Sequence, residues 1–92
     1  MPDKSIVYRA HAVRRMFERR LSAEAVRAVV DGGETIEEYP DDHPYPSRLV
    51  LGWVAGRPVH VVVAESDEAR IVVTAYEPAA ALWSSDFRRR TP

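Results

Sequence analysis

Two histidines and a row of arginines are the side chains of this chain best suited to chemistry at neutral pH. His11, Arg15 and Arg19 are four residues apart in AHAVRRMFERR, so a helix there places them in one row. Neighbouring cations repel one another unless an anion lies against them. The row therefore indicates either a site for an anion such as a phosphate, or a solvated helix face that pairs with Glu18 and the acidic residues further along.

His60 is the second candidate, because it is a lone titratable residue inside the apolar run PVHVVVA. An imidazole titrates near pH ~6.5 and is suited to act as a general acid or base at neutral pH. The alternative is a buried neutral histidine that is hydrogen-bonded to a backbone carbonyl or to Tyr76. The residues alone leave both interpretations open.

Arg48 and Tyr76 join His60 if the strands have the register that their turns favour. A three-residue turn VAG with Gly56 in the left-handed conformation places Val50 opposite His60. A loop with an odd number of residues around 67–69 places Tyr76 or Thr74 of the third strand opposite His60. Arg48, His60 and Tyr76 are then expected on one face, where Arg48 would bind a phosphate and Tyr76 would donate to the same group. The opposite face is apolar and is expected to pack on the helices, with Leu49, Leu51, Trp53, Val59, Val61, Val63, Ile71, Val73 and Ala75.

Metal and cofactor chemistry finds little support in the residues. The chain has no cysteine, which excludes a disulfide framework and a thiolate zinc site. His11, His43 and His60 with a carboxylate would make a ligand set, but no two of the three have the short spacing of metal ligands. Phosphate-binding loops, dinucleotide fingerprints and nucleophile elbows are also missing from the sequence. We expect neither a metal nor a cofactor.

The region that must position these residues is RLVLGWVAGRPVHVVVAESDEARIVVTAY, which predicts three consecutive β-strands over residues 48–76. Apolar periodicity predicts one helix at about 10–20 and a second that begins after an N-cap at Ser22 and ends at Gly32 and Gly33. ETIEEY, residues 34–39, is expected to be an edge strand because of its acidity. Residues 5–8 either form a first strand or pack the N-terminus down.

These elements predict an α+β fold in which two N-terminal helices pack on a small antiparallel sheet of three to four strands. Ninety-two residues suffice for one domain, so we expect residues 1–92 to form a single unit with a core at about 5–83. PAAALW is expected to make a helical turn with Leu82 and Trp83 packing back, and residues 84–92 to be a frayed polar tail.

Charge is distributed unevenly although the net charge is only −1. Residues 1–30 contain seven Lys or Arg against three acidic residues, whereas residues 31–47 contain six acidic residues and no base. Such an asymmetry can steer an anionic ligand or can be neutralised within the molecule. No apolar run approaches the length of a membrane span and the N-terminus lacks the apolar segment of a signal peptide, so we expect a cytoplasmic protein without membrane contact.

Three stretches carry a family resemblance: HAVRRMFERRLSAEAV, GGETIEEYPDDHPYPSRLVLGWVAGRPVHVVVA and IVVTAYEP. Over about residues 8–78 the chain resembles the domain-of-unknown-function family 4258, whose pattern these motifs follow in order. The positions that fit the pattern are His11, Arg15, Met16, Arg19, Arg48, Gly56, Arg57, Pro58, His60, Thr74 and Tyr76.

More distantly, the chain is similar to the RelE and BrnT toxins, which are ribonucleases of toxin–antitoxin systems. This resemblance implies a RelE-like fold and metal-independent RNA cleavage, with RNA and a cognate antitoxin as partners. It implies a catalytic centre made of His60, His11, Arg48 and Tyr76, and phosphate-binding residues Arg15, Arg19 and Arg57. The alternative function is a non-catalytic protein–protein interaction module, as a homodimer or with another protein, that uses the PDDHPYP loop and an open sheet edge.

Overall fold

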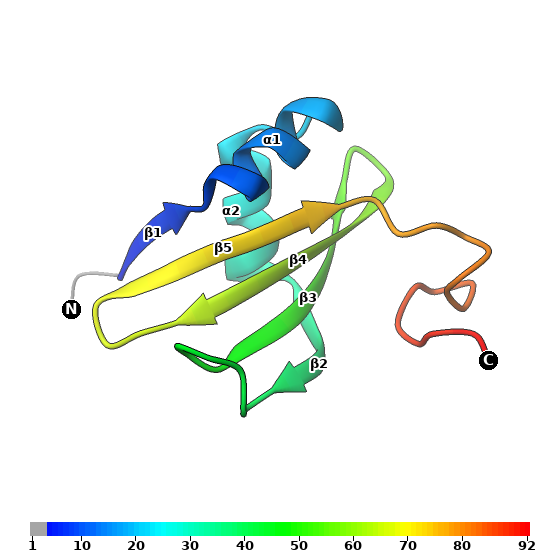
Figure 1. Cartoon of the computed structure of the whole chain (residues 1–92). Coiled ribbons are helices and arrows are strands. Elements are labelled where there is room, and N and C mark those ends of the chain that lie inside the picture. The colour runs from blue at the N-terminus through cyan, green and yellow to red at the C-terminus, as the bar shows by residue number, and fades with distance from the viewer. Residues whose placement is uncertain (1–3) are drawn as a thin grey trace.

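The computed structural model describes residues 4–92 (Figure 1). Its sheet is built around three long antiparallel strands, β3 (Ser47–Val54), β4 (Arg57–Glu65) and β5 (Ala69–Tyr76). The acidic strand β2 (Glu34–Tyr39) pairs with β3 and lies at one edge, as predicted. The strand β1 (Ser5–Tyr8) lies at the other edge, and the order is β1-β5-β4-β3-β2.

The prediction of an antiparallel sheet with three to four strands was therefore wrong in two respects. The sheet has five strands, and it is mixed because β1 runs parallel to β5 from Ser5↔Ala69 to Tyr8↔Val72. β1 is only four residues long and its partner lies more than sixty residues further along the chain. A segment this short carries too little periodicity to show which strand it will join.

Two helices, α1 (Ala10–Glu18) and α2 (Ala23–Gly32), pack on one face of the sheet (Figure 1). The side chain of Ser22 caps α2 by accepting a hydrogen bond from the backbone N–H of Ala25 at 3.0 Å. α1 contacts mainly β5 and α2 mainly β3. The core between them contains Ala12, Met16, Leu21, Val26, Val29, Val30, Val50, Val59, Val61, Val63, Val72 and Ala75. This part of the chain confirms the predicted α+β class and both helices.

The turn between β3 and β4 has two residues and not the predicted three. Ala55 (φ 51°) and Gly56 (φ 79°) are both left-handed, so Val54 pairs with Arg57 and Leu51 pairs with His60. Two left-handed residues make the tight hairpin turn that suits twisted strands. Because successive side chains alternate between the faces, the one-residue difference turns β3 over relative to the prediction.

Val50 consequently faces the helices. Leu49, Leu51 and Trp53 lie on the opposite face of the sheet, away from the helices, which we call the far face. His60 also lies on the far face, since its neighbours Val59 and Val61 are in the helix-facing core. His60 pairs with Tyr76, one of the two predicted partners, and β5 accommodates Val73 as an extra residue between Val62↔Thr74 and Val63↔Val72.

The C-terminal segment, residues 77–92, packs against the far side of the sheet and is not a frayed tail. Trp83 is 5% exposed, and the backbone N–H of Ser84 donates to the carbonyl of Arg89 at 2.7 Å. Arg88 and Arg90 bind Glu34 and Glu37 of β2 at 2.8 and 3.2 Å. The predicted turn is present from Ala79 to Leu82, but Leu82 is 64% exposed and does not pack back. In the described part of the chain no helix is long and apolar enough to cross a membrane.

Two glycines offer a matched test of the helix-to-sheet packing. A Cβ at Gly52 would lie 2.7 Å from Val29 Cγ2, whereas a Cβ at Gly32 would meet nothing within 4 Å. We expect Gly52→Ala to lower the free energy of unfolding by about 1–3 kcal/mol, as overpacking does. Gly32→Ala, at the end of α2, should be neutral or stabilise by up to about 1 kcal/mol. Urea denaturation of both variants measures this, and equal stabilities would contradict the described contact of α2 with β3.

Candidate functional site

A groove of 390 Å³ lies between α1 and the C-terminal segment, beside the last residues of β5. It exists because β1 pairs with β5 only as far as Val72, so within residues 4–92 no strand covers the β1 side of β5 at Thr74 and Tyr76, whose other side pairs with β4. The exposed face of α1 borders one side of this opening, and the segment after β5 borders the other. The lining residues are His11, Arg15, Arg19, Thr74, Tyr76, Glu77, Ala79, Leu82, Trp83 and Arg90.

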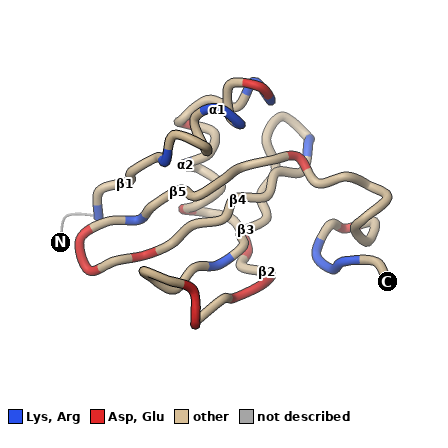
Figure 2. Tube along the Cα trace, in the orientation of Figure 1, with Lys and Arg blue, Asp and Glu red and all other residues tan. Residues whose placement is uncertain are grey.

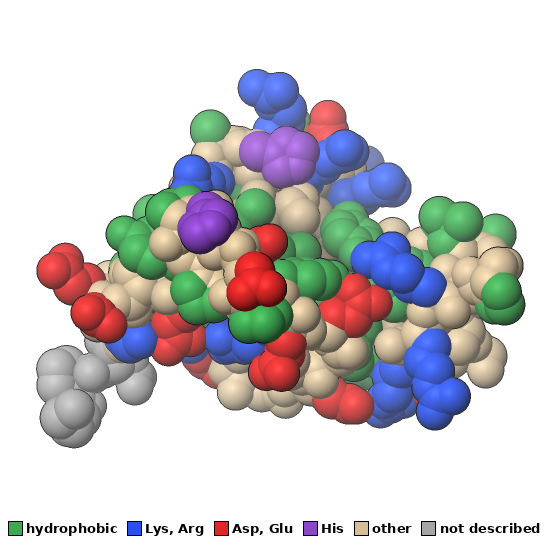
Figure 3. All heavy atoms as spheres, turned by 60° about the horizontal axis from the view of Figure 1, so that its bottom comes forward, with side chains coloured by type: hydrophobic (Ala, Val, Ile, Leu, Met, Phe, Trp, Pro, Cys, Tyr) green, Lys and Arg blue, Asp and Glu red, His purple; other side chains and the backbone are tan. Residues whose placement is uncertain are grey.

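The groove collects positive charge on a molecule whose net charge is −1. Lys and Arg are frequent on α1 and the C-terminal segment, and Asp and Glu on β2 and the loops at the other end of the sheet, with single residues of the opposite sign in both regions (Figure 2). On the face shown in Figure 3, basic side chains gather in these same two places with hydrophobic surface between them. The predicted row His11, Arg15 and Arg19 therefore lines a shared groove and is not only a solvated helix face.

The basic side chains of the groove differ in how far they are neutralised. Arg15 lies 3.7 Å from Glu18, a weak pairing because both side chains are about half exposed. Arg19 makes no ion pair within residues 4–92. The one acid of the groove, Glu77, lies 3.3 Å from Arg57 outside it. An anion in the groove would thus meet Arg15 and Arg19 with little competition from a carboxylate, whereas Arg90 is paired with Glu37 at 3.2 Å.

Arg90 and Trp83 form the wall opposite α1, and the sequence did not point to either residue as part of a site. The Arg90 guanidinium lies 4.7 Å from the centre of the Trp83 ring, a cation–π contact. Its Nε donates to Glu37 at 3.2 Å, and Glu37 also accepts a hydrogen bond from the Tyr39 hydroxyl. The Tyr39 hydrogen bond is the main reason that the pKa of Glu37 is lowered, so this carboxylate stays charged and holds Arg90 in place.

His60 is completely buried behind the groove, with no exposed surface. Its Nε2 lies 2.9 Å from the carbonyl oxygen of Phe87, which can only accept, so Nε2 carries the proton and donates. Nδ1 then accepts from the Tyr76 hydroxyl at 3.2 Å. Burial lowers the pKa of His60, although the hydrogen bond to Phe87 acts in the opposite direction. Of the two interpretations left open by the sequence, the structure matches the buried neutral histidine.

Tyr76 connects this buried imidazole to the groove. Its hydroxyl has one proton, which it donates to His60 Nδ1, while its side chain lines the groove. Burial raises the pKa of Tyr76, so the phenol stays neutral at physiological pH. The Tyr76 and His60 rings meet edge to face with centroids 5.3 Å apart, and Trp83 packs on the imidazole at 4.4 Å. His60 therefore acts on the groove only through Tyr76 and Trp83.

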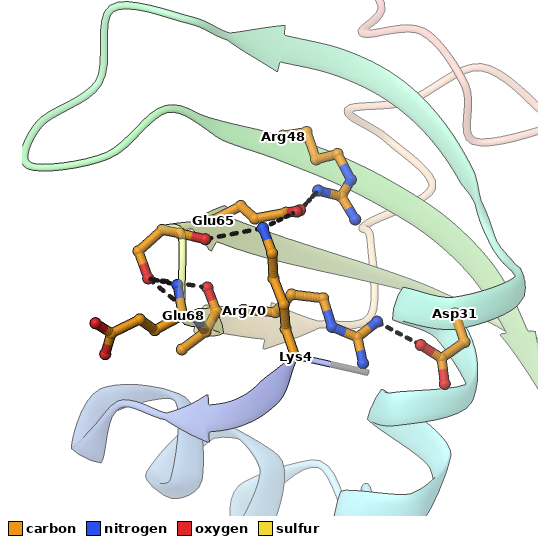
Figure 4. Close-up of polar contacts among 8 residues, drawn as sticks. Lys4, Asp31, Arg48, Glu65, Glu68 and Arg70 are labelled. Carbon is orange, nitrogen blue, oxygen red and sulfur yellow. Dashed lines mark hydrogen bonds and ion pairs between the residues drawn. The ribbon is translucent and has the colours of Figure 1, made fainter. Parts of the chain in front are cut away.

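Arg48 does not reach the groove, so the predicted grouping of Arg48 with His60 was wrong. Because β3 is turned over, Arg48 lies on the helix side of the sheet, where it donates to Glu65 at 2.9 Å. Lys4 donates to the same carboxylate at 2.7 Å, and these two hydrogen bonds, that of Lys4 first, lower the pKa of Glu65 (Figure 4). Arg70 binds Asp31 nearby (Figure 4). Arg48 thus belongs to an ionic cluster that joins β3, β4 and Lys4, the residue before β1.

The predicted site residues therefore separate into two groups. His11, Arg15, Arg19 and Tyr76 line one groove, together with Thr74. The others lie elsewhere: His60 is behind the groove wall, Arg48 is in the ionic cluster, and Arg57 pairs with Glu77 beside the β3–β4 turn. In residues 4–92 no three His, Asp or Glu side chains come together as a metal ligand set would.

Comparison with known proteins gives one match. The sequence model of a family described as "Domain of unknown function (DUF4258)" matches residues 8–77. This range contains His11, Arg15 and Arg19, which we call the α1 row, and the β5 residues of the groove. It does not contain Trp83 and Arg90 on the opposite wall. Neither the curated proteins nor the solved structures contain a significant match to the chain.

The buried imidazole predicts a specific pH dependence of stability. Since the folded-state pKa of His60 is below its ordinary value of 6.5, the unfolded chain binds a proton near that pH before the folded chain does. Stability is therefore complete above about pH 7 and is lost as the pH falls below 6.5. Asp31, Glu37 and Glu65 also have lowered pKa values, but their ordinary values of 3.8 to 4.5 place their effect at lower pH.

We expect His60→Gln to lose about 2 kcal/mol of unfolding free energy at pH 7.5, because buried partners lose a hydrogen bond. Between pH 7.5 and 5.5 the variant should also show a flatter pH dependence than the wild type. Urea denaturation at several pH values measures both effects. The surface residues His11 and His43 are present in both proteins, so parallel curves would show that His60 is not the titrating group.

Proposed function

The chain belongs to this family of unknown function, and we propose that it binds single-stranded RNA and cleaves it without a metal, as the toxin component of a toxin–antitoxin pair. The observation that supports the proposal is the meeting of His11, Arg15 and Arg19 with Arg90 around one open groove. The more distant resemblance to RelE and BrnT toxins suggests the reaction and the partner.

Phosphodiester binding is the first step of the proposal. Guanidinium groups bind phosphate oxygens through paired N–H donors, and such contacts provide most of the affinity of proteins for nucleic acid backbones. Arg15 and Arg19 approach from α1, and Arg90 approaches from the other wall. A phosphate between them would be held from both sides. Hydrophobic surface from Leu82, which is 64% exposed, lies beside these cations and suits the sugar and base.

Cleavage is the second step and uses the RNA's own 2′-hydroxyl as the nucleophile. In the proposal, His11 accepts the proton of this hydroxyl as its oxygen attacks the neighbouring phosphorus. Arg15, Arg19 and Arg90 stabilise the charge of the pentacovalent phosphate. The bond from phosphorus to the 5′-oxygen breaks, and that oxygen takes a proton from solvent in the open groove. The products are a 2′,3′-cyclic phosphate and a 5′-hydroxyl end.

The remaining candidates have supporting roles in this proposal. His60 and Tyr76 position the groove wall, since the one hydroxyl proton of Tyr76 is donated to the buried imidazole. Arg48 and Arg57 are bound to Glu65 and Glu77 and stabilise the fold. We therefore assign the chemistry to the α1 row and not to the sheet.

Variants of α1 separate binding from cleavage. We expect Arg15→Ala to weaken RNA binding several-fold and to reduce the slope of log affinity against log salt by about 1, the effect of one lost phosphate contact. His11→Ala should bind RNA within about twofold of the wild type but cleave it about 10²–10⁴ times more slowly, the usual contribution of a general base. Fluorescence anisotropy with labelled oligonucleotides and gel analysis of products, both in EDTA, provide the measurements.

Arg14→Ala is the matched control, because it removes the same charge from α1 but at a position outside the groove. Equal effects of Arg14→Ala and Arg15→Ala would show that only the general charge of the helix matters. Wild-type protein that neither binds nor cleaves RNA, and that does not arrest growth when expressed, would refute the proposed function.

The alternative function, a non-catalytic interaction module, is favoured by one different observation. Val13 and Phe17, one turn apart on α1, are 51% and 86% exposed and form an apolar pair on the surface. As a homodimer contact or the site of another protein, this pair would need no chemistry at His11. In that case Phe17→Ser would abolish self-association in sedimentation experiments, and no variant would change RNA binding.

A further inference from the structure

Trp53 is a large aromatic residue that the fold leaves at the surface. It was expected in the helix-facing core, but the turned-over β3 places it on the far face, where it is 54% exposed. The pairing of β2 with β3 ends at Glu34↔Leu51, so β2 does not cover it. Trp53 borders a hollow of 300 Å³ at this open edge, lined also by Ala28, Val29, Gly32, Gly33, Glu34, Leu51, Gly52 and Arg88.

The surface between Trp53 and the groove at α1 is continuous. A further hollow of 420 Å³ shares Arg19, Glu77 and Ala79 with that groove and extends to Pro58 and Phe87. Pro58 is the register partner of Trp53 on β4, and the Phe87 ring meets Trp53 edge to face with centroids 6.1 Å apart. One extended ligand can therefore contact the α1 row, pass over Pro58 and Phe87, and reach Trp53.

The charge of the surface changes along this path, from the α1 row past Pro58 and Phe87 to Trp53. The α1 end is basic, but beside Trp53 the Arg88 guanidinium is bound to Glu34 at 2.8 Å and to Asp86 at 3.4 Å. These two carboxylates neutralise Arg88, so the hollow offers a phosphate little attraction. It offers an uncharged planar group an indole side chain that is 54% exposed, with a paired guanidinium beside it. The path thus suits a ligand that is anionic at one end and flat and neutral at the other.

We propose that Trp53 is a base-stacking subsite, on which an unpaired nucleobase stacks when a phosphate of the same RNA strand lies in the groove at Arg15 and Arg19. This inference rests on the proposed function, and it defines the substrate as single-stranded RNA several nucleotides long. Stacking on an aromatic side chain requires a base outside a duplex and accepts every base, because each has a flat π-face.

The test compares binding of fluorescein-labelled oligouridine of three and of nine nucleotides, at low salt, to the wild type, Trp53→Ala and Trp53→Phe. We expect Trp53→Ala to weaken binding of the nine-nucleotide RNA about tenfold, as the loss of one stacked base does. Binding of the three-nucleotide RNA should stay within twofold. Trp53→Phe should retain most of the affinity for the longer RNA, since it keeps an aromatic face.

Tyr45→Ala is the matched control, since Tyr45 is 39% exposed but lies outside the path described above. If Trp53→Ala binds both RNAs like the wild type while Arg15→Ala weakens both, the subsite is refuted and the proposed function remains. A loss of affinity for both RNAs in Trp53→Ala, or an equal loss in Tyr45→Ala, would also refute the subsite. If neither RNA binds to the wild type, both proposals fail. If Trp53→Ala changes the sedimentation coefficient without RNA, a second copy of the chain covers the indole and the subsite is refuted.

Discussion

The hydrogen bond from His60 Nε2 to the carbonyl of Phe87 is the contact on which the arrangement of the candidate site depends. It joins the middle of the sheet to a segment with no helix or strand of its own, at 2.9 Å. Phe87 is left-handed, with φ 62°, a conformation that costs a residue with a side chain about 1–2 kcal/mol. A residue keeps such a conformation where the surrounding contacts hold it there. Here the left-handed conformation of Phe87 occurs together with its carbonyl facing the imidazole of His60. The contact between Trp83 and Arg90, which flank Phe87 in the sequence, and the packing of Trp53 on the Phe87 ring depend on the same anchor.

The acidic strand β2 explains how a chain with net charge −1 can keep a basic groove. Glu34 and Glu37 bind Arg88 and Arg90, so two of the three glutamates of β2 hold the C-terminal segment on the sheet. The α1 row is not neutralised in this way, because Glu18 lies close only to Arg15. Attraction for an anion is therefore local and short-ranged, and it should weaken with salt more than a buried contact would. The low net charge bears on solubility and association rate more than on what the groove can bind.

Local pattern was sufficient to predict some of this structure. The four-residue spacing of His11, Arg15 and Arg19 placed them in one row, and Ser22 and the acidic ETIEEY behaved as their chemistry suggests. The register of β3 could not be predicted in this way, because it depends on whether Ala55 becomes left-handed, which alanine rarely does. That single residue decided that Arg48 and His60 lie on opposite faces. The parallel pairing of β1 and the anchoring of Phe87 are contacts between distant segments and leave no periodic signal. The packing of Trp83 was predicted, but the polar residues after it were wrongly interpreted as a frayed tail.

The hydroxyl of Tyr76 limits what the groove can offer an anion. Its single proton is donated to His60 Nδ1, so an anion in the groove would meet the lone pairs of this oxygen and not a donor. Tyr76 could donate to the anion only if His60 were protonated on both nitrogens, and burial opposes this by lowering the pKa of His60. Arg90 also disfavours the charged imidazole, whereas Glu37 favours it. The buried pair therefore stabilises the groove wall. Binding of a phosphate must come mainly from the guanidinium groups of Arg15 and Arg19, which need no change of protonation, because Arg90 is already paired with Glu37.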